Sequence, residues 1–217
     1  MQNNWEPEQY DLQPFTTIEP EEEVEERPPS NFARGCLRFL LDVVETIALA
    51  VLLYLAINAV AARVRVQGRS MYPTFKGGEF ILVYRLAYHN SLPHRGDIIV
   101  FHPEMIKKQG FGWLNVENDF IKRVIGLPGE EVKIYGGKVY INGKPLKEPY
   151  IAEPPRYTGV WKIPKGKVFV LGDNRNNSTD SHVFGPVPIK YIIGRAVFIY
   201  YPPGEWGIIR RVQYDTP

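Results

Sequence analysis

The amino-acid sequence predicts a mainly β protein, in which an antiparallel β-sheet domain follows one N-terminal membrane-spanning helix. Two observations lead to this fold class. A single uncharged apolar run lies near the N-terminus, and no other long stretch has helical character. After residue 62, short β-rich runs alternate with turn residues as far as residue 200. The 217 residues, 44% of them hydrophobic, are enough to bury one sizeable core.

The apolar run extends from Thr46 to Ala62 and contains no charged residue. At ~1.5 Å per residue it covers about 25 Å, slightly less than the ~30 Å hydrocarbon layer of a bilayer. We therefore extend the predicted helix upstream, to residues 37–62, with Asp42 and Glu45 near the interface. A buried core helix is one alternative, and a signal peptide cleaved after Ala61 is another. The long acidic region that precedes the run argues against cleavage.

The formal net charge of +2 conceals a strong asymmetry. Residues 1–33 carry nine acidic residues against one basic residue, Arg27, and they contain five prolines. This composition predicts a disordered acidic arm. The remaining chain carries 25 basic and 15 acidic residues, and the small overall charge argues against a nucleic-acid-binding protein. Cys36 is the single cysteine, so an intramolecular disulfide and a metal site built on several thiolates are both excluded.

The extramembrane domain is predicted to occupy residues 63–217. The expected strands are 63–68, 80–84, 97–101, 119–125, 132–135, 138–141, 167–171 and 193–200. The clearest local signal is the pair Gly136 and Gly137 between two β-rich runs, because two glycines supply the positive φ of a two-residue hairpin turn. Asn142 and Gly143 predict a second reversal directly afterwards.

Three blocks of this domain contain residues that could carry chemistry. They are residues 68–74 (GRSMYPT), 120–129 (FIKRVIGLPG) and 172–181 (GDNRNNSTDS). Ser70 in the first block is a candidate nucleophile, and a serine nucleophile needs a base to accept its proton. None of the four histidines lies in a pattern that marks a catalytic triad, although Asp97 and His102 could meet in space. The histidines are His89, His94, His102 and His182.

Lys122, in the second block, can serve as the base if its pKa falls from ~10.4 toward ~7 to 8. In a strand, Lys122 shares one face with Phe120 and Val124, whereas Arg123 points to the other face. Burial between apolar side chains would lower the pKa of the lysine. A lysine in a strand can also reach solvent from an exposed position, and this reading stays open from the residues alone.

The third block reads first as a solvated turn, because it is rich in Asp, Asn and Ser. A calcium-binding loop is the second interpretation, but its pattern is broken: Arg175 and Ser178 replace a ligand and a glycine, and Phe184 stands where a glutamate is required.

Taken in order, the three blocks resemble those of the type I signal peptidase family, which are membrane-anchored serine proteases with a Ser-Lys dyad. The resemblance covers roughly residues 38–200 and implies the mainly β fold of that family, without cofactor or metal. It implies an endopeptidase that cleaves signal peptides from exported preproteins after small residues, at sites of the Ala-x-Ala type. Ser70 would be the nucleophile and Lys122 the general base. Ser178 would hydrogen-bond and orient the lysine amine.

The resemblance also assigns supporting and substrate-binding residues. A charge network would steady the site, formed by Asp173, Arg175 and Asp180 with Arg123 as a partner. In the strand that precedes the nucleophile, alternate valines can line shallow pockets while the backbone pairs with an extended peptide. The pocket walls would be Val64, Val66, Met71, Phe75, Phe120 and Ile121, some of which could equally be core residues.

The chain departs from the family at three positions. Asn176 replaces a frequent aspartate and His182 a frequent arginine, so the ion pairing around Asp180 is uncertain. Gly68 stands where some members have a serine that helps to hold the oxyanion. The backbone N–H of Ser70 is the natural first donor to the oxyanion, and the second donor stays open.

Partners and location follow from the same resemblance. Signal peptides and the lipid bilayer are the expected partners of a monomeric chain, with no nucleic acid. The expected location is the plasma (inner) membrane, with a single span and the catalytic domain on the extracytoplasmic side, and a thylakoid membrane is the alternative. The aromatic segment Lys107–Leu114 and the tip at Trp206 are candidate contacts with lipid headgroups. A non-catalytic membrane-anchored paralogue is a rival, as is a soluble Ser-Lys protease of the self-cleaving repressor type.

Overall fold

The computed structural model describes residues 31–102, 104 and 118–214. Residues 1–30 of the expected acidic arm, and the aromatic segment Lys107–Leu114, lie outside the described residues. The chain forms two units, residues 1–49 and 50–217, whose boundary falls inside the first helix. Each unit is described by itself.

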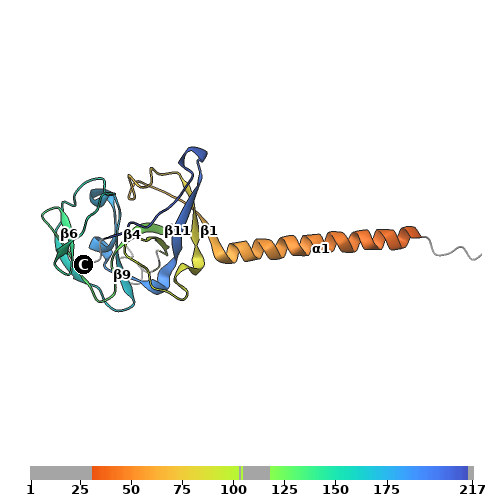
Figure 1. Cartoon of the computed structure of the whole chain (residues 1–217), viewed down its shortest axis with the longest axis horizontal. Coiled ribbons are helices and arrows are strands. Elements are labelled where there is room, and N and C mark those ends of the chain that lie inside the picture. Colours follow the sequence, from red (N-terminus) through yellow and green to blue (C-terminus); the bar gives the residue numbers. More distant parts are fainter. Residues whose placement is uncertain (1–30, 103, 105–117, 215–217) are drawn as a thin grey trace, which may run out of the picture. The chain divides into compact units, whose positions relative to one another are not determined.

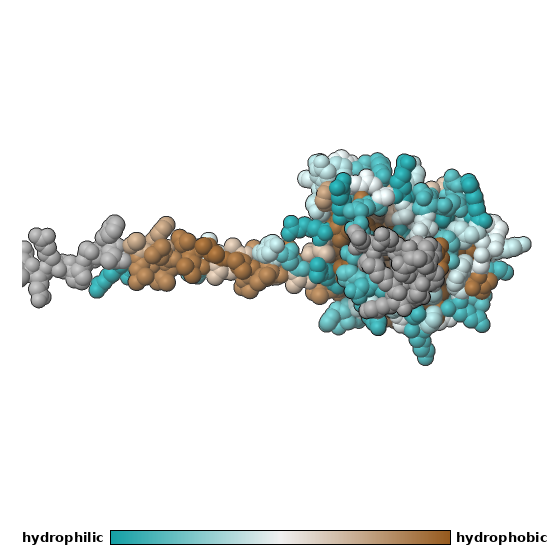
Figure 2. Space-filling view, turned by 180° about the vertical axis from the view of Figure 1, so that it is seen from behind, coloured by the Kyte–Doolittle hydropathy of each residue, from teal (hydrophilic) through white to brown (hydrophobic). Residues whose placement is uncertain are grey.

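The helix α1 (Asn31–Val60) contains the apolar run. Residues 34–60 are long and apolar enough to cross a membrane, by length and composition, and none of the side chains in their most apolar stretch is buried. Figure 2 shows these apolar side chains as a continuous surface. The helix ends two residues before the expected end at 62. Ala61 and Ala62 belong to a strand instead, because their backbones pair with Tyr84 and Val83.

The larger sheet has eight strands, in the order β1-β2-β11-β3-β4-β9-β10 with β12 beside β11 (Figure 1). Every pairing in it is antiparallel, so the predicted fold class is confirmed. The strands are β1 (Ala61–Arg65), β2 (Phe80–Tyr84), β3 (Ile98–Phe101), β4 (Phe120–Gly126), β9 (Lys167–Leu171), β10 (Val187–Pro188), β11 (Ile192–Tyr201) and β12 (Gly207–Ile208).

A smaller sheet has the order β7-β6-β5-β8. Its strands are β5 (Glu131–Tyr135), β6 (Lys138–Ile141), β7 (Lys144–Pro145) and β8 (Gly159–Lys162). The predicted hairpin between β5 and β6 is confirmed, since Gly136 and Gly137 have φ angles of 56° and 74°. A short helix α3 (Ser181–Phe184) and several single 3₁₀ turns complete the described chain.

Three apolar clusters form the core of the β unit. One packs under β1, β2 and β11 and includes Met71 and Phe75 from the loop between β1 and β2. The second lies around β3, β4, β9 and β10. The third joins the two sheets, because Phe169 and Leu171 of β9 pack with Val132 and Ile134 of β5. The middle of β4 is therefore surrounded by packed apolar side chains.

The sequence analysis did not predict the strands β7, β8, β10 and β12. Three of these strands have only two residues and β8 has four, too few for an alternating pattern to emerge. They form because neighbouring strands already present unpaired backbone groups.

We predict that Gly194→Ala in β11 destabilises the β unit. A Cβ atom at this position would lie 2.4 Å from the backbone oxygen of Tyr84, so the strands β11 and β2 would have to separate. The expected loss is roughly 1–3 kcal/mol in the free energy of unfolding. Gly204→Ala is the matched control, because its Cβ would meet no atom within 4 Å. Urea unfolding of the detergent-solubilised chain compares the two, and equal midpoints would contradict the close approach.

Candidate active site

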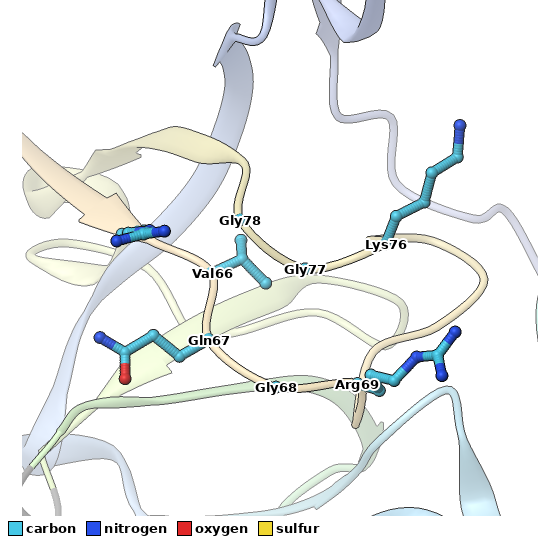
Figure 3. A pocket seen from close by; sticks show the side chains of 8 residues that line it. Val66, Gln67, Gly68, Arg69, Lys76, Gly77 and Gly78 are labelled. Atoms are coloured by element: carbon cyan, nitrogen blue, oxygen red, sulfur yellow. The ribbon is translucent and has the colours of Figure 1, made fainter.

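Ser70 lies in a loop that returns on itself between β1 and β2. Backbone hydrogen bonds from Val66 N–H to Glu79 C=O (2.7 Å) and from Gly78 N–H to Val66 C=O (2.9 Å) close the loop. Figure 3 shows residues 66–69 running beside residues 76–78. Buried Met71 and Phe75 attach the far end of the loop to the first core cluster. Ser70 itself remains half-buried, so its hydroxyl is accessible.

Gly68 lies two residues before Ser70 and has a φ angle of 76°. This left-handed conformation is costly for residues with a side chain, so glycine suits this backbone. A serine hydroxyl at position 68 is thus not available to this chain, and any second oxyanion donor comes from elsewhere.

Lys122 lies in the middle of β4, with 4% of its surface exposed. Its Nζ atom is 2.8 Å from Ser70 Oγ and donates a second hydrogen bond to Ile121 C=O at 3.1 Å. Burial lowers the pKa of Lys122 from 10.5 to about 8, against the opposing attraction of Asp180 and Asp173. The structure thus brings a buried, readily neutralised amine into contact with the serine hydroxyl.

Asp173 connects three parts of the site. Arg123 binds it through two hydrogen bonds, Nε to Oδ1 at 2.8 Å and Nη2 to Oδ2 at 2.6 Å. The hydroxyl of Thr74, from the nucleophile loop, donates to Asp173 Oδ2. Burial disfavours the charged guanidinium, but the hydrogen bond and attraction of Asp173 outweigh it and raise the pKa of Arg123. This pair is nearly inaccessible to solvent.

Arg175 is also buried, but it has a different partner. It forms a two-pronged pair with Glu148, at 2.8 and 2.5 Å, and its Nε donates to Gly172 C=O. The resemblance implied one network of Asp173, Arg175 and Asp180, whereas the structure shows separate pairs. Glu148 was missed by the sequence analysis, because it lies outside the three blocks and nothing in its local pattern marks it.

Asp180 accepts hydrogen bonds from Gly172 N–H at 2.9 Å and from the backbone and ring of His182. The ring Nδ1 of His182 lies 2.6 Å from the carboxylate, and the ring stacks on Tyr157 with centroids 4.0 Å apart. The departure from the family pattern at residue 182 therefore retains a partner for Asp180, with an imidazole in place of a guanidinium.

The structure does not show the hydrogen bond expected between Ser178 and Lys122. The Oγ atom of Ser178 is buried and has no hydrogen-bond partner among the described residues. It lies beside Gly172, where a Cβ atom would come within 2.3 Å of this hydroxyl and 2.5 Å of Ser70 C=O. Ser178 and Ser70 therefore approach Gly172 closely, and the lysine amine turns to Ser70 and Ile121 instead.

A cleft of about 280 Å³ opens beside the dyad. Of the expected pocket walls, four line it: Val66, Met71, Phe120 and Ile121. Two do not: Val64 and Phe75 pack in the first core cluster. Polar residues missed by the sequence analysis also line the cleft, and the Nδ2 atom of Asn118 donates to Gln67 Oε1 at 3.2 Å.

A second hollow, of about 530 Å³, shares residues 66–69 with the cleft and is completed by residues 76–78 (Figure 3). Arg65, Arg69 and Lys76 make it cationic, and Lys76 is paired with Glu205 at 2.5 Å.

The histidine-based alternative receives no support from the geometry. Asp97 does not meet His102; it accepts hydrogen bonds from Tyr88 and Arg211. His102 instead contacts Asp119 at 3.0 Å, and its ring does not line the cleft. Within the part of the chain that the structure describes, no three His, Cys, Asp or Glu side chains gather in a way that could hold a metal ion.

Comparison with known proteins agrees with this arrangement. Residues 40–201 match the model of the family described as signal peptidase, peptidase S26. The chain is 49% identical over 170 residues to signal peptidase I of Leptolyngbya laminosa, covering 77% of this chain and 83% of the relative. It is 43% identical over 173 residues to probable signal peptidase I-1 of Synechocystis, covering 78% and 87%.

A chloroplast protein is also similar. Thylakoidal processing peptidase 1 of Arabidopsis thaliana is 38% identical over 152 residues, which cover 68% of this chain and 44% of that protein. The family match spans all three sequence blocks, and so includes Ser70 and Lys122. The chain therefore belongs to the signal peptidase family, peptidase S26, a family of serine peptidases.

Proposed function

We propose that this chain is a signal peptidase I that cleaves preproteins after Ala-x-Ala-type sites, with Ser70 as nucleophile and Lys122 as general base. One observation carries the proposal: the buried amine of Lys122 lies 2.8 Å from the hydroxyl of Ser70. A non-catalytic paralogue would be expected to lose one of these two groups, and both are present. The repressor-type rival is soluble, whereas this chain carries a helix that fits a membrane anchor.

In the proposed first step, neutral Lys122 accepts the proton of Ser70 while Oγ forms a bond to the carbonyl carbon before the cut. The carbonyl oxygen becomes an oxyanion, which the backbone N–H of Ser70 stabilises. Collapse of this intermediate breaks the peptide C–N bond, and the ammonium of Lys122 gives its proton to the leaving amine. Lys122 then accepts a proton from a water molecule whose oxygen bonds to the acyl carbon. Collapse of this second intermediate breaks the bond between the acyl carbon and Ser70 Oγ, and the ammonium of Lys122 returns the proton to Oγ.

The proposed preference for small residues rests on the cleft wall. Val66 and Met71 are 3% and 2% exposed, and with Ile121 they leave little free depth next to Ser70. An alanine methyl group fits a shallow apolar pocket, whereas a larger side chain would have to displace packed core atoms.

The proposed location is a membrane that α1 spans once, with the β unit on the extracytoplasmic side. The length and apolar composition of residues 34–60 support a span. Relatives from Synechocystis and from the Arabidopsis thylakoid support either a plasma membrane or a thylakoid membrane.

We predict that Ser70→Ala and Lys122→Ala each abolish cleavage of an Ala-x-Ala preprotein by the detergent-solubilised chain. The double variant should be no worse than either single variant, because the dyad acts as a unit. His102→Ala is the control and should keep close to full activity, since its ring is exposed and paired with Asp119. An inactive His102 variant beside an active Lys122 variant would refute the dyad.

The pH dependence follows from the charge of Lys122. The ammonium form has no lone pair for the Ser70 proton, so activity is lost as pH falls below the pKa of about 8. We predict that kcat/KM rises tenfold per pH unit at low pH and levels off around a midpoint near that value. Ser178→Ala should leave the midpoint in place, because burial, and not the Ser178 hydroxyl, sets the lysine charge. A midpoint near ~10.4 would show a solvated lysine.

Substrate choice should widen in Val66→Ala. Removing two methyl groups from the cleft wall makes room for Val or Leu before the cut, with a loss of discrimination of roughly 1–3 kcal/mol. Val64→Ala is the matched control, because Val64 does not line the cleft. The ratio of kcat/KM for Ala and Val substrates measures the effect. Unchanged preference in Val66→Ala would place the pocket elsewhere.

A further inference from the structure

Asn174 binds the backbone on both sides of the nucleophile. Its own N–H donates to Ser70 C=O at 3.0 Å, and its side-chain Nδ2 donates to Arg69 C=O at 3.1 Å. Two successive carbonyl groups are thus held by one residue from a distant loop. These bonds join the nucleophile loop to the loop after β9 at the residue that carries the hydroxyl.

The side-chain bond controls the direction of a neighbouring N–H. The Arg69–Ser70 peptide is trans, since the cis bonds in the described chain precede Pro73 and Pro202. In a planar trans peptide the C=O and the N–H point in opposite directions. A donor that holds Arg69 C=O therefore also fixes where the N–H of Ser70 points. No group in the described ranges accepts a hydrogen bond from this N–H.

We propose that Asn174 is a positioning residue whose side-chain amide aims the backbone N–H of Ser70 at the oxyanion of the reaction. The inference rests on the proposed function, because it assigns a role within that chemistry. An oxyanion donor is effective only when it is oriented before the reaction, so that no reorganisation is needed in the transition state.

A second donor also reaches Arg69 C=O, the N–H of Tyr72 at 3.1 Å. Tyr72 belongs to the same turn as Ser70, so this bond keeps the turn closed but moves with it. Asn174 instead follows β9, which pairs with β4 through Leu171 and Arg123. Lys122 is the neighbouring residue on β4. The amide of Asn174 therefore holds the N–H donor in the same frame as the base.

The experiment separates this role from general support of the fold. Asn174→Ala and the near-isosteric Asn174→Asp both remove the side-chain donor and keep the backbone N–H. Asn176→Ala and Asn176→Asp are matched controls in the same loop, because the side chain of Asn176 is exposed and contacts Pro154 and Glu153. All four are compared with the parent chain in kcat, in KM and in inhibition by a substrate-like peptide aldehyde, whose adduct with Ser70 places an oxygen in the oxyanion position.

Loss of a complete oxyanion donor lowers kcat by ~10²–10³, and a misdirected donor should lose part of this, about 10- to 100-fold. Both Asn174 variants should show this fall with KM within about twofold, a similar weakening of aldehyde inhibition and an unmoved pH midpoint. The Asn176 variants should stay within about twofold of the parent.

Equal kinetics of the Asn174 and Asn176 variants would overturn the inference. A shift in the pH midpoint would also overturn it, because Asn174 would then act on Lys122. If the parent chain itself cleaves nothing, the proposed function fails. If the parent is active and Asn174→Asp is equally active, only this inference fails.

Discussion

The buried pair of Arg123 and Asp173 is the interaction on which the site depends. It joins β4 to the loop after β9, and through the hydroxyl of Thr74 it also holds the nucleophile loop. Its geometry is two-pronged and nearly dry, with side-chain exposures of 2% and 0%. Removal of one partner from such a pair typically costs ~3–5 kcal/mol, because the other charge is left buried and unpaired. The strand that carries Lys122, the loop that carries Ser70 and the loop after β9 are thus joined at one buried ion pair.

Adjacent residues of β4 have opposite electrostatic requirements. Arg123 must remain charged, and its carboxylate partner ensures this despite burial. The proposed chemistry needs a neutral Lys122, and this amine faces a hydroxyl, a carbonyl and the ring of Phe120 instead of a carboxylate. Asp173 and Asp180 attract the ammonium of Lys122 and favour it, although they accept their own hydrogen bonds from Arg123 and from Gly172 N–H. Burial outweighs this attraction and lowers the pKa of Lys122.

The sequence predicted the positions of some residues in the fold and not those of others. The alternation along β4 predicted that the side chains of Lys122 and Arg123 point to opposite faces of the strand, and they contact different groups, Ser70 and Asp173. Side-chain direction in a strand depends only on local geometry, so it can be predicted from the sequence. Ala61 and Ala62 were assigned to the helix, because alanine carries no signal for the β2 partner that captures them.

Contacts between segments far apart in the sequence could not be predicted from local sequence patterns. Glu148 and Asn174 acquire their roles from residues 27 and 105 positions away, and no periodicity records such pairings. The hydrogen bond of Ser178 to Lys122 was inferred by resemblance, but the structure does not show it, and the amine contacts Ser70 and Ile121. Val64 and Phe75 were expected in the pocket, but they pack with the first core cluster. Alternation puts Val64 and Val66 on one face of the chain without showing how far along that face the cleft extends.

The continuity of α1 and β1 has a consequence for encounter with substrate. The helix ends at Val60, the strand begins at Ala61, and Ser70 follows within ten residues. A fully extended chain of that length spans at most about 35 Å. With the helix in a bilayer, the nucleophile is confined to a thin layer next to it, and a membrane-bound preprotein is confined to the same layer. Tethering of this kind raises effective concentration without any new contact. With such tethering, a cleft of the size seen here needs less intrinsic affinity for its substrate.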